Sequence, residues 1–141
     1  MEGIDILIEE YNKNPVNNFK MEDPTLVRHE GNFICGDDLT VYLKLDWDII
    51  QQMSFDGNPS NITIAAASLL CELVEWVSIE EVITWDYQTM IDNGFEVSPK
   101  RKRAAVITLL AIRNAYHQRK NQKEEWTDKI LEEDFDSFFD D

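Results

Sequence analysis

The 141-residue chain contains few side chains that can act as nucleophiles or as soft metal ligands. One short motif, Cys35-Gly36-Asp37, places a thiol and a carboxylate two positions apart, directly before an alternating apolar segment. A thiolate is both a nucleophile and a metal ligand, and loop residues at strand ends are accessible to partners. The motif therefore predicts sulfur or metal chemistry at Cys35 and Asp37, although a turn without function would carry the same residues.

The other sulfur and imidazole groups are interpreted as structural. Cys71 stands nine residues after Ile62 in an apolar helical pattern, about 13 Å along the axis at ~1.5 Å per residue. We expect this cysteine to be buried among leucines rather than to reach a ligand site at the helix start. His29 and His117 are isolated in the sequence, so a Cys–His pair would require a tertiary contact, and we expect both to be surface or packed residues.

The segments around the motif have the periodicity of strands. Apolar residues alternate with polar ones over 39–45, which predicts a half-buried strand. A turn is expected at 46–48, a second strand over 49–55 that ends before Gly57-Asn58-Pro59, and a third strand over 25–33.

Helical spacing predicts the remaining elements. The expected helices cover residues 4–12, a segment from Ile62 capped by Ser60 or Asn61, a short segment after Ser78, and residues 103–118. Strands followed by helices predict an α+β fold. It consists of an N-terminal helix, a three-stranded antiparallel sheet, and helices packed on one face of that sheet.

The charge of the chain excludes several classes of partner. Asp and Glu number 28 against 13 Lys and Arg, which gives a formal net charge of -15. Such a chain repels nucleic-acid phosphates and anionic membrane surfaces, so neither nucleic acid nor membrane is expected as a partner. The acidic N-terminus lacks the basic region of a signal peptide, and the apolar runs are far shorter than the ~20 residues of a membrane span. We therefore expect a cytoplasmic protein.

The last part of the chain differs in composition. Residues 124–141 hold 9 acidic residues and 1 basic residue, together with Trp126 and three phenylalanines. This predicts a domain over 1–123 and an acidic, aromatic tail over 124–141. The tail is interpreted either as a solvated extension or as a segment that docks, onto the basic run 100–103 or onto a partner.

Short blocks of sequence occur in a fixed order through these segments. They are Lys13-Asn14-Pro15, Glu22-Asp23-Pro24, His29-Glu30-Gly31-Asn32, Cys35-Gly36-Asp37-Asp38-Leu39-Thr40-Val41, Ser54-Phe55-Asp56-Gly57, Ala65-Ala66-Ala67-Ser68-Leu69-Leu70, Glu72-Leu73-Val74 and Ser78-Ile79-Glu80-Glu81. Together they resemble the IscU/SufU/NifU-type iron–sulfur cluster scaffold family, and the segment from Pro99 to Ala115 stays in register with it. The resemblance implies the same fold with a site at one end, and cytoplasmic assembly of iron–sulfur clusters. It also implies a pyridoxal-phosphate cysteine desulfurase as the partner that supplies sulfur.

The resemblance further implies where ligands would stand. Cys35 and Asp37 match the first cysteine and the aspartate of the family's ligand set. The positions of the other two cysteines hold Ser60 and Ala104, and a neighbouring histidine position holds Arg103. A serine hydroxyl stays protonated near pH 7 and alanine has no side-chain donor, so one chain supplies two of four ligands. A monomer would then bind an iron–sulfur cluster or zinc weakly or not at all.

What remains is a nucleophilic sulfur. We expect Cys35 to accept sulfur from a desulfurase as a persulfide, so that the protein is a sulfur carrier rather than an enzyme that turns over. Arg103 would stabilise the Cys35 thiolate if the fold brings the two close, and Asp37 would oppose it. One alternative is a non-catalytic module that docks on and regulates a cysteine desulfurase or another scaffold. Another is self-association, in which two copies of Cys35 and Asp37 complete a bridged cluster.

Overall fold

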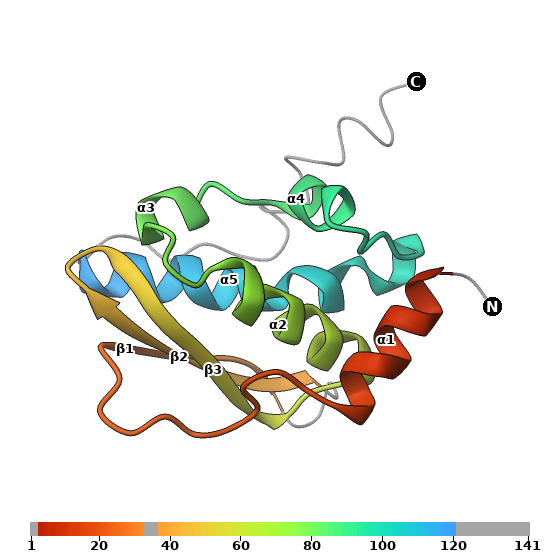
Figure 1. The fold of residues 1–141 in the computed structure, drawn as a ribbon, viewed down its shortest axis with the longest axis horizontal. Helices are drawn as coiled ribbons and strands as arrows, with labels where there is room; N and C mark the ends of the chain where they lie inside the picture. The colour runs from red at the N-terminus through yellow and green to blue at the C-terminus, as the bar shows by residue number, and fades with distance from the viewer. Residues whose placement is uncertain (1–2, 33–36, 121–141) are drawn as a thin grey trace.

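The computed structural model describes residues 3–32 and 37–120, and its elements follow the α+β order expected from the sequence (Figure 1). They are α1 (Gly3–Lys13), β1 (Leu26–Asn32), β2 (Asp37–Asp46), β3 (Ile49–Asn58), α2 (Asn61–Leu73), α3 (Ile79–Val82), α4 (Tyr87–Asp92), a 3-10 turn η1 (Pro99–Arg101) and α5 (Lys102–Arg119). α2 and α5 pack side by side on one face of the sheet, and α3 and α4 lie beyond them (Figure 1). The predicted fold class is confirmed.

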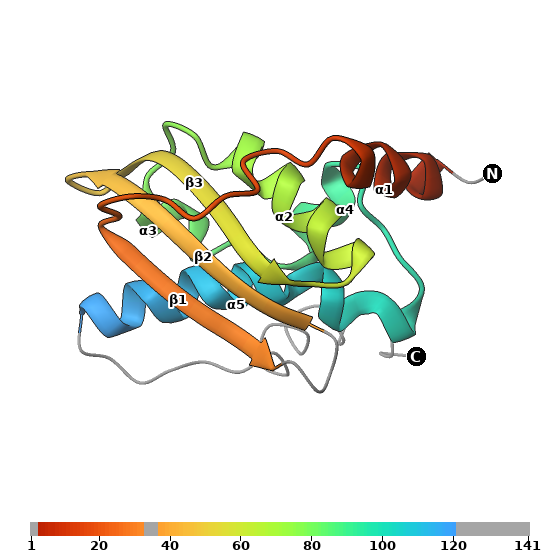
Figure 2. The ribbon, with the colours of Figure 1, turned by 90° about the horizontal axis from the view of Figure 1, so that it is seen from below.

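The sheet is antiparallel throughout, in the order β1-β2-β3, and its alternation decides which side chains face the helices. Leu39 and Val41 of β2 are fully buried and lie opposite Gly57 and Phe55 of β3. α5 runs along this face and crosses β1 and β2 (Figure 2). The apolar layer between sheet and helices is therefore the core of the domain.

α2 begins where the sequence predicts. Ser60 is its N-cap, with φ of -67° and ψ of 165°, and its hydroxyl accepts a hydrogen bond from the N–H of Thr63. Cys71 lies in the core face of the same helix with 1% of its surface exposed. Burial raises the pKa of the Cys71 thiol, so this residue is the inert core cysteine that its apolar neighbours predict.

β3 extends to Asn58, three residues beyond the end that its alternation predicts. Gly57 makes this possible, because it adopts a φ of 114° and an added Cβ would stand 2.2 Å from the carbonyl oxygen of Asp38. Gly31 of β1 is placed in the same way, with a φ of 78° and an added Cβ 1.7 Å from the carbonyl oxygen of Asp37. The two glycines let both neighbouring strands approach the first residues of β2.

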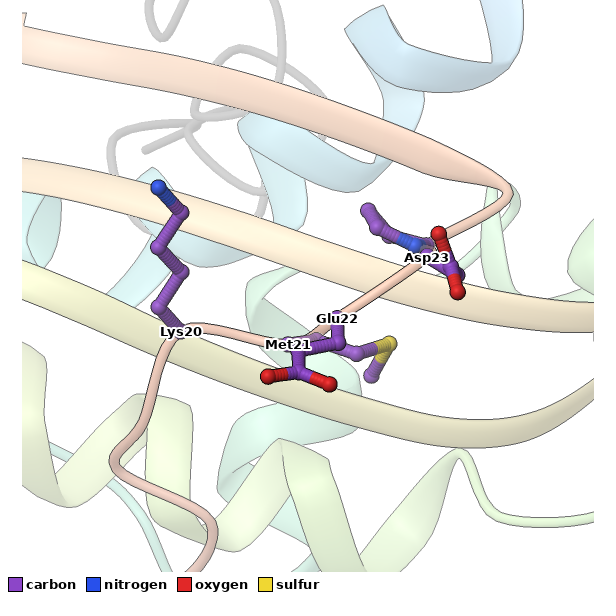
Figure 3. A pocket seen from close by; sticks show the side chains of 5 residues that line it. Lys20, Met21, Glu22 and Asp23 are labelled. Carbon is purple, nitrogen blue, oxygen red and sulfur yellow. The ribbon is translucent and has the colours of Figure 1, made fainter.

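The loop after α1 crosses the outer face of the sheet, opposite the helices. Met21 is 6% exposed there, and the N–H of Thr25 donates to the carbonyl oxygen of Leu43 at 2.8 Å. Figure 3 shows this segment in front of the strands. Its side chains line a hollow of about 580 Å³. The hollow is lined by Lys20, Met21, Glu22, Asp23 and Pro24. Its lining comes from one segment and contains no thiol, hydroxyl or imidazole group.

Within residues 3–32 and 37–120, no helix is both long and apolar enough to cross a membrane. The cytoplasmic location stays a prediction. The division into 1–123 and 124–141 falls outside the described residues and stays a prediction too.

Candidate functional site

Asp37, the first residue of β2, directs its carboxylate at the start of α2. Its Oδ1 accepts a hydrogen bond from the backbone N–H of Ser60 at 2.9 Å and another from the hydroxyl of Thr63 at 2.6 Å. The first N–H groups of a helix have no partner within the helix and carry partial positive charge, so they stabilise a carboxylate. The side chain of Asp37 thus ties the sheet to the start of α2.

Ser60 uses its hydroxyl to cap α2. Its Oγ accepts from the N–H of Thr63 at 3.4 Å and donates to the Oγ1 of Thr63 at 3.1 Å. A cap of this kind contributes about 1 kcal/mol to helix stability. The hydroxyl at the second expected ligand position is therefore engaged within the helix start.

Thr63 joins these groups. It is fully buried, and its one hydroxyl proton has two acceptors in reach, the Oδ1 of Asp37 at 2.6 Å and the carbonyl oxygen of Ala104 at 3.3 Å. The shorter contact to the charged acceptor is the stronger one. We call Asp37, Ser60 and Thr63 the clasp. Three of the four expected ligand positions, Asp37, Ser60 and Ala104, thus meet around one threonine.

Sequence reasoning missed Thr63, because it stands within an apolar helical pattern. The available signal was its spacing from Ser60. A polar side chain three residues after an N-cap reaches back toward the residues that precede the helix, as in a capping box.

The donors at these positions do not fit a zinc ion or an iron–sulfur cluster. Asp37 offers a carboxylate with one oxygen already bonded twice, Ser60 a neutral hydroxyl, and Ala104 no side-chain donor. Structural zinc takes four Cys, His or carboxylate ligands, and clusters take thiolates. In the described part of the chain, no three His, Cys, Asp or Glu side chains form a group that could hold a metal ion.

The two other expected site residues, Cys35 and Arg103, are not members of the clasp. Cys35 lies outside the described residues, two positions before Asp37 in the chain. Arg103 is exposed in the first turn of α5, next to Ala104. The action of Arg103 on the Cys35 thiolate stays a prediction.

A largely buried polar cluster links β1, the strand that precedes Cys35 in the chain, to α5. The Nε of Arg28 lies 2.6 Å from the Oε2 of Glu30, and the Nδ2 of Asn114 donates to the same oxygen at 2.9 Å. The side chains of Arg28 and Glu30 are only 15% and 12% exposed, although both are charged. Inward-pointing charges on an edge strand disfavour its pairing with the strand of another chain.

Neither histidine belongs to the clasp. The Nε2 of His29 lies 2.5 Å from the Oδ1 of Asp38, and 52% of the histidine side chain is exposed. His117 is half-buried and packs edge-on against Tyr116, with ring centroids 5.8 Å apart. Both are surface or packed residues, as expected.

A hollow of about 320 Å³ opens beside the clasp, between α1, η1 and the start of α2. It is lined by Asp5, Ile8, Ser60, Asn61, Ile62 and Arg101. Solvent therefore reaches one side of Ser60, whereas Thr63 is fully buried behind it.

Sequence comparison places this geometry among known proteins. Residues 5–138 match the model of the NifU-like N terminal domain family, so the match reaches into the acidic segment 124–141. The iron–sulfur cluster assembly scaffold protein IscU of Thermotoga maritima is 32% identical over 65 residues, 46% of this chain and 46% of that protein. The zinc-dependent sulfurtransferase SufU of Bacillus subtilis is 31% identical over 78 residues, 55% of this chain and 52% of that protein. The chain thus spans about half the length of each of these two relatives.

Structure comparison agrees on the fold. A structure from Fervidobacterium islandicum, assigned to an iron–sulfur cluster assembly scaffold protein for the SUF system, superposes with a TM-score of 0.66. The two are 22% identical, and the superposition covers 77% of this chain and 93% of that one. The family match extends over most of the sequence, and the chain therefore belongs to the NifU-like N-terminal domain family of iron–sulfur cluster assembly scaffolds, with relatives of the IscU and SufU types.

Proposed function

We propose that this protein accepts a sulfur atom from a cysteine desulfurase on Cys35 and carries it as a persulfide. The clasp is the observation that carries the proposal. Asp37 and Ser60 are hydrogen-bonded to the start of α2, and Ala104 has no side-chain donor. A chain with this donor set lacks a cage for metal, whereas a nucleophilic thiol needs none.

The transfer is an exchange between sulfur atoms. The Cys35 thiolate attacks the terminal sulfur of a cysteine persulfide on the desulfurase, and a new S–S bond forms. The old S–S bond breaks, and its electron pair stays on the desulfurase cysteine as a thiolate. One thiolate enters and one leaves, so the step requires no external oxidant or reductant.

Positive charge near the clasp can offset the negative charge of Asp37. Asp37 stands two positions from Cys35, and its negative charge opposes the thiolate. Its Oδ1 faces the start of α2, where a partial charge of roughly +0.5 offsets that repulsion. Arg103 adds a full positive charge in the first turn of α5, beside Ala104. Both positive charges would stabilise a thiolate close to the clasp.

One relative supports sulfur transfer but differs in its metal requirement. The Bacillus subtilis protein is named a zinc-dependent sulfurtransferase, and it matches about half of the present chain. We propose the transfer here without zinc, because the described donors do not complete a zinc site.

Mass spectrometry after reaction with a cysteine desulfurase and cysteine tests the proposal. The peptide that contains Cys35 should gain the mass of one sulfur atom, about 32 Da, or a multiple of it. Cys71→Ala is the matched control, because Cys71 is buried and its removal should leave the label unchanged. An unlabelled Cys35 peptide, alongside a second acceptor protein that is labelled in parallel, would refute the proposal.

The same reaction separates the carrier from a non-catalytic regulator. A regulator would alter the rate at which the desulfurase releases sulfide equally well with Cys35→Ser. A carrier would lose its effect with this variant while still binding the desulfurase.

A further inference from the structure

The end of the domain opposite the clasp exposes two tryptophans. Trp47, in the turn between β2 and β3, is 88% exposed, and Trp76, in the connection between α2 and α3, is 65% exposed. The β2–β3 turn and the α2–α3 connection lie together at one end of the molecule, whereas α2 begins at the other end (Figures 1 and 2).

Backbone hydrogen bonds hold the two tryptophan segments together. The N–H of Trp76 donates to the carbonyl oxygen of Ile50 at 2.7 Å, and the N–H of Ile79 donates to that of Asp48 at 2.7 Å. Ile49, which pairs with Ser78 across this contact, is 39% exposed. We call Trp47, Ile49 and Trp76 the tryptophan patch. Its members come from two segments that are fixed relative to each other.

Both tryptophans have a left-handed backbone conformation, which is unfavourable for bulky side chains. Their φ angles are 56° for Trp47 and 67° for Trp76, in the left-handed region where bulky side chains are rare. Glycine or asparagine would fit these positions with less strain. Since neither indole is buried in the core, the fold gains little packing in return. A strained, exposed tryptophan is a reason to look for a function outside the fold.

The residues next to the patch in the chain are mostly acidic. Asp46, Asp48 and Glu75 adjoin the tryptophans in sequence, and Glu80 and Glu81 follow in the first turn of α3. The Nη1 of Arg119 lies 3.8 Å from the Oδ1 of Asp48 and offsets part of this charge. A second copy of a chain with net charge -15 is repelled at such a surface, and so is the acidic segment 124–141. A basic partner is attracted.

We propose that the tryptophan patch is a docking surface for a protein that presents arginine side chains around an apolar segment. Arginine stacks on indole faces and pairs with carboxylates, so it complements both parts of the surface. Tryptophan also contributes more than most residues to the binding energy of interfaces. Because the patch and the clasp lie at opposite ends, such a partner can stay bound while another protein approaches the clasp.

Binding of two synthetic peptides to the full-length protein tests this inference without a desulfurase, so its outcome is independent of the sulfur-carrier proposal. The probe is an amphipathic helical peptide of about 18 residues with leucines on one face and arginines on the other. The control peptide has the same sequence with glutamate in place of every arginine. We expect Trp47→Asn combined with Trp76→Asn to weaken binding of the arginine peptide at least about tenfold, since asparagine tolerates the left-handed backbone.

The control variant removes exposed apolar side chains elsewhere. Ile6 and Phe19 are 49% and 41% exposed, and Ile6→Asn combined with Phe19→Asn should leave binding unchanged. Equal binding by all variants would overturn the inference, because the arginine peptide would then be attracted by the overall negative charge of the protein and not by the tryptophans. Binding of the glutamate peptide would overturn it as well.

Hydroxyl-radical footprinting of the free, dilute protein tests for other occupants. Trp47 and Trp76 should be oxidised readily, as their exposure requires. Protection of both in the absence of peptide would mean that a second copy or residues 121–141 already cover the patch. That result would overturn the inference.

Discussion

Replacing Thr63 with valine removes one hydroxyl while keeping the branched shape of the side chain. The Oδ1 of Asp37 then loses the hydrogen bond at 2.6 Å, and the hydroxyl of Ser60 loses its acceptor. A hydrogen bond to a charged group contributes about 1.5–3 kcal/mol, so we expect the free energy of unfolding to fall by about 2 kcal/mol. For a domain of this size, Tm should fall by about 5–8 °C.

Urea denaturation followed by circular dichroism measures this loss, and the m-value should stay unchanged. Thr108→Val is the matched control. Thr108 is also fully buried, but its hydroxyl has no hydrogen-bond partner among the described residues. Its replacement should change the free energy of unfolding by no more than about 0.5 kcal/mol, or raise it. Equal losses in the two variants would contradict this prediction, because the loss would then come from the poor fit of valine rather than from the missing hydrogen bond.

A double-mutant cycle assigns the loss to the clasp. Asp37→Asn and Thr63→Val should each destabilise the domain, and the combined variant should lose less than their sum by about 0.5–3 kcal/mol. Additive effects would mean that the two side chains do not interact in solution.

Three further predictions follow from the geometry. Gly31→Ala should lower the free energy of unfolding in urea by more than about 2 kcal/mol, because its Cβ would stand 1.7 Å from a backbone oxygen. Gly94→Ala, at a φ of 86° with nothing within 4 Å, should lose only about 1 kcal/mol, and equal losses would contradict the close approach. Desolvation, and then a hydrogen bond to a glutamate of α2, raise the pKa of Tyr11 to about 12. Because the pKa of Tyr11 is higher in the folded than in the unfolded protein, its contribution to the free energy of unfolding is complete below pH 10. That contribution is lost as the pH rises from 10 to 12. Tyr11→Phe should therefore make the free energy of unfolding fall less steeply over that range, and an unchanged slope would contradict this. Ser60→Cys combined with Ala104→Cys supplies thiols at the two missing ligand positions, so zinc affinity in a chelator competition should rise by at least about 100-fold. No rise would mean that the two positions do not converge in solution.

Periodicity in the sequence predicts most of the fold. The alternation over 39–45 and the helical spacing after Ile62 depend only on which side chains face the core, and both elements form as expected. The predicted end of β3 was wrong, because the prediction relied on glycine and asparagine, which usually end a strand. Here the left-handed φ of Gly57 lets the strand continue against β2.

The clasp could be predicted only in part. The resemblance identifies Asp37, Ser60 and Ala104 as ligand positions, and the cap at Ser60 follows from its residue type. The bond from Thr63 to Asp37 joins residues 26 positions apart, and its existence depends on how β2 meets α2. No local pattern contains that information.

The tryptophan patch was also outside the reach of hydropathy patterns. Tryptophan is on average a highly buried residue, and nothing in the turn around Trp47 indicates that its side chain points to solvent. Exposure at this position depends on the left-handed backbone of the turn, which the residue type disfavours.

Cys35 is proposed to accept sulfur without a metal site. Desulfurase-dependent labelling of the Cys35 peptide should therefore be measured in the presence and in the absence of a zinc chelator that leaves the desulfurase active. We expect the same amount of transferred sulfur in both reactions, because the donors that the described residues place around the clasp do not complete a zinc site. Transfer that disappears with the chelator and returns with added zinc would contradict it.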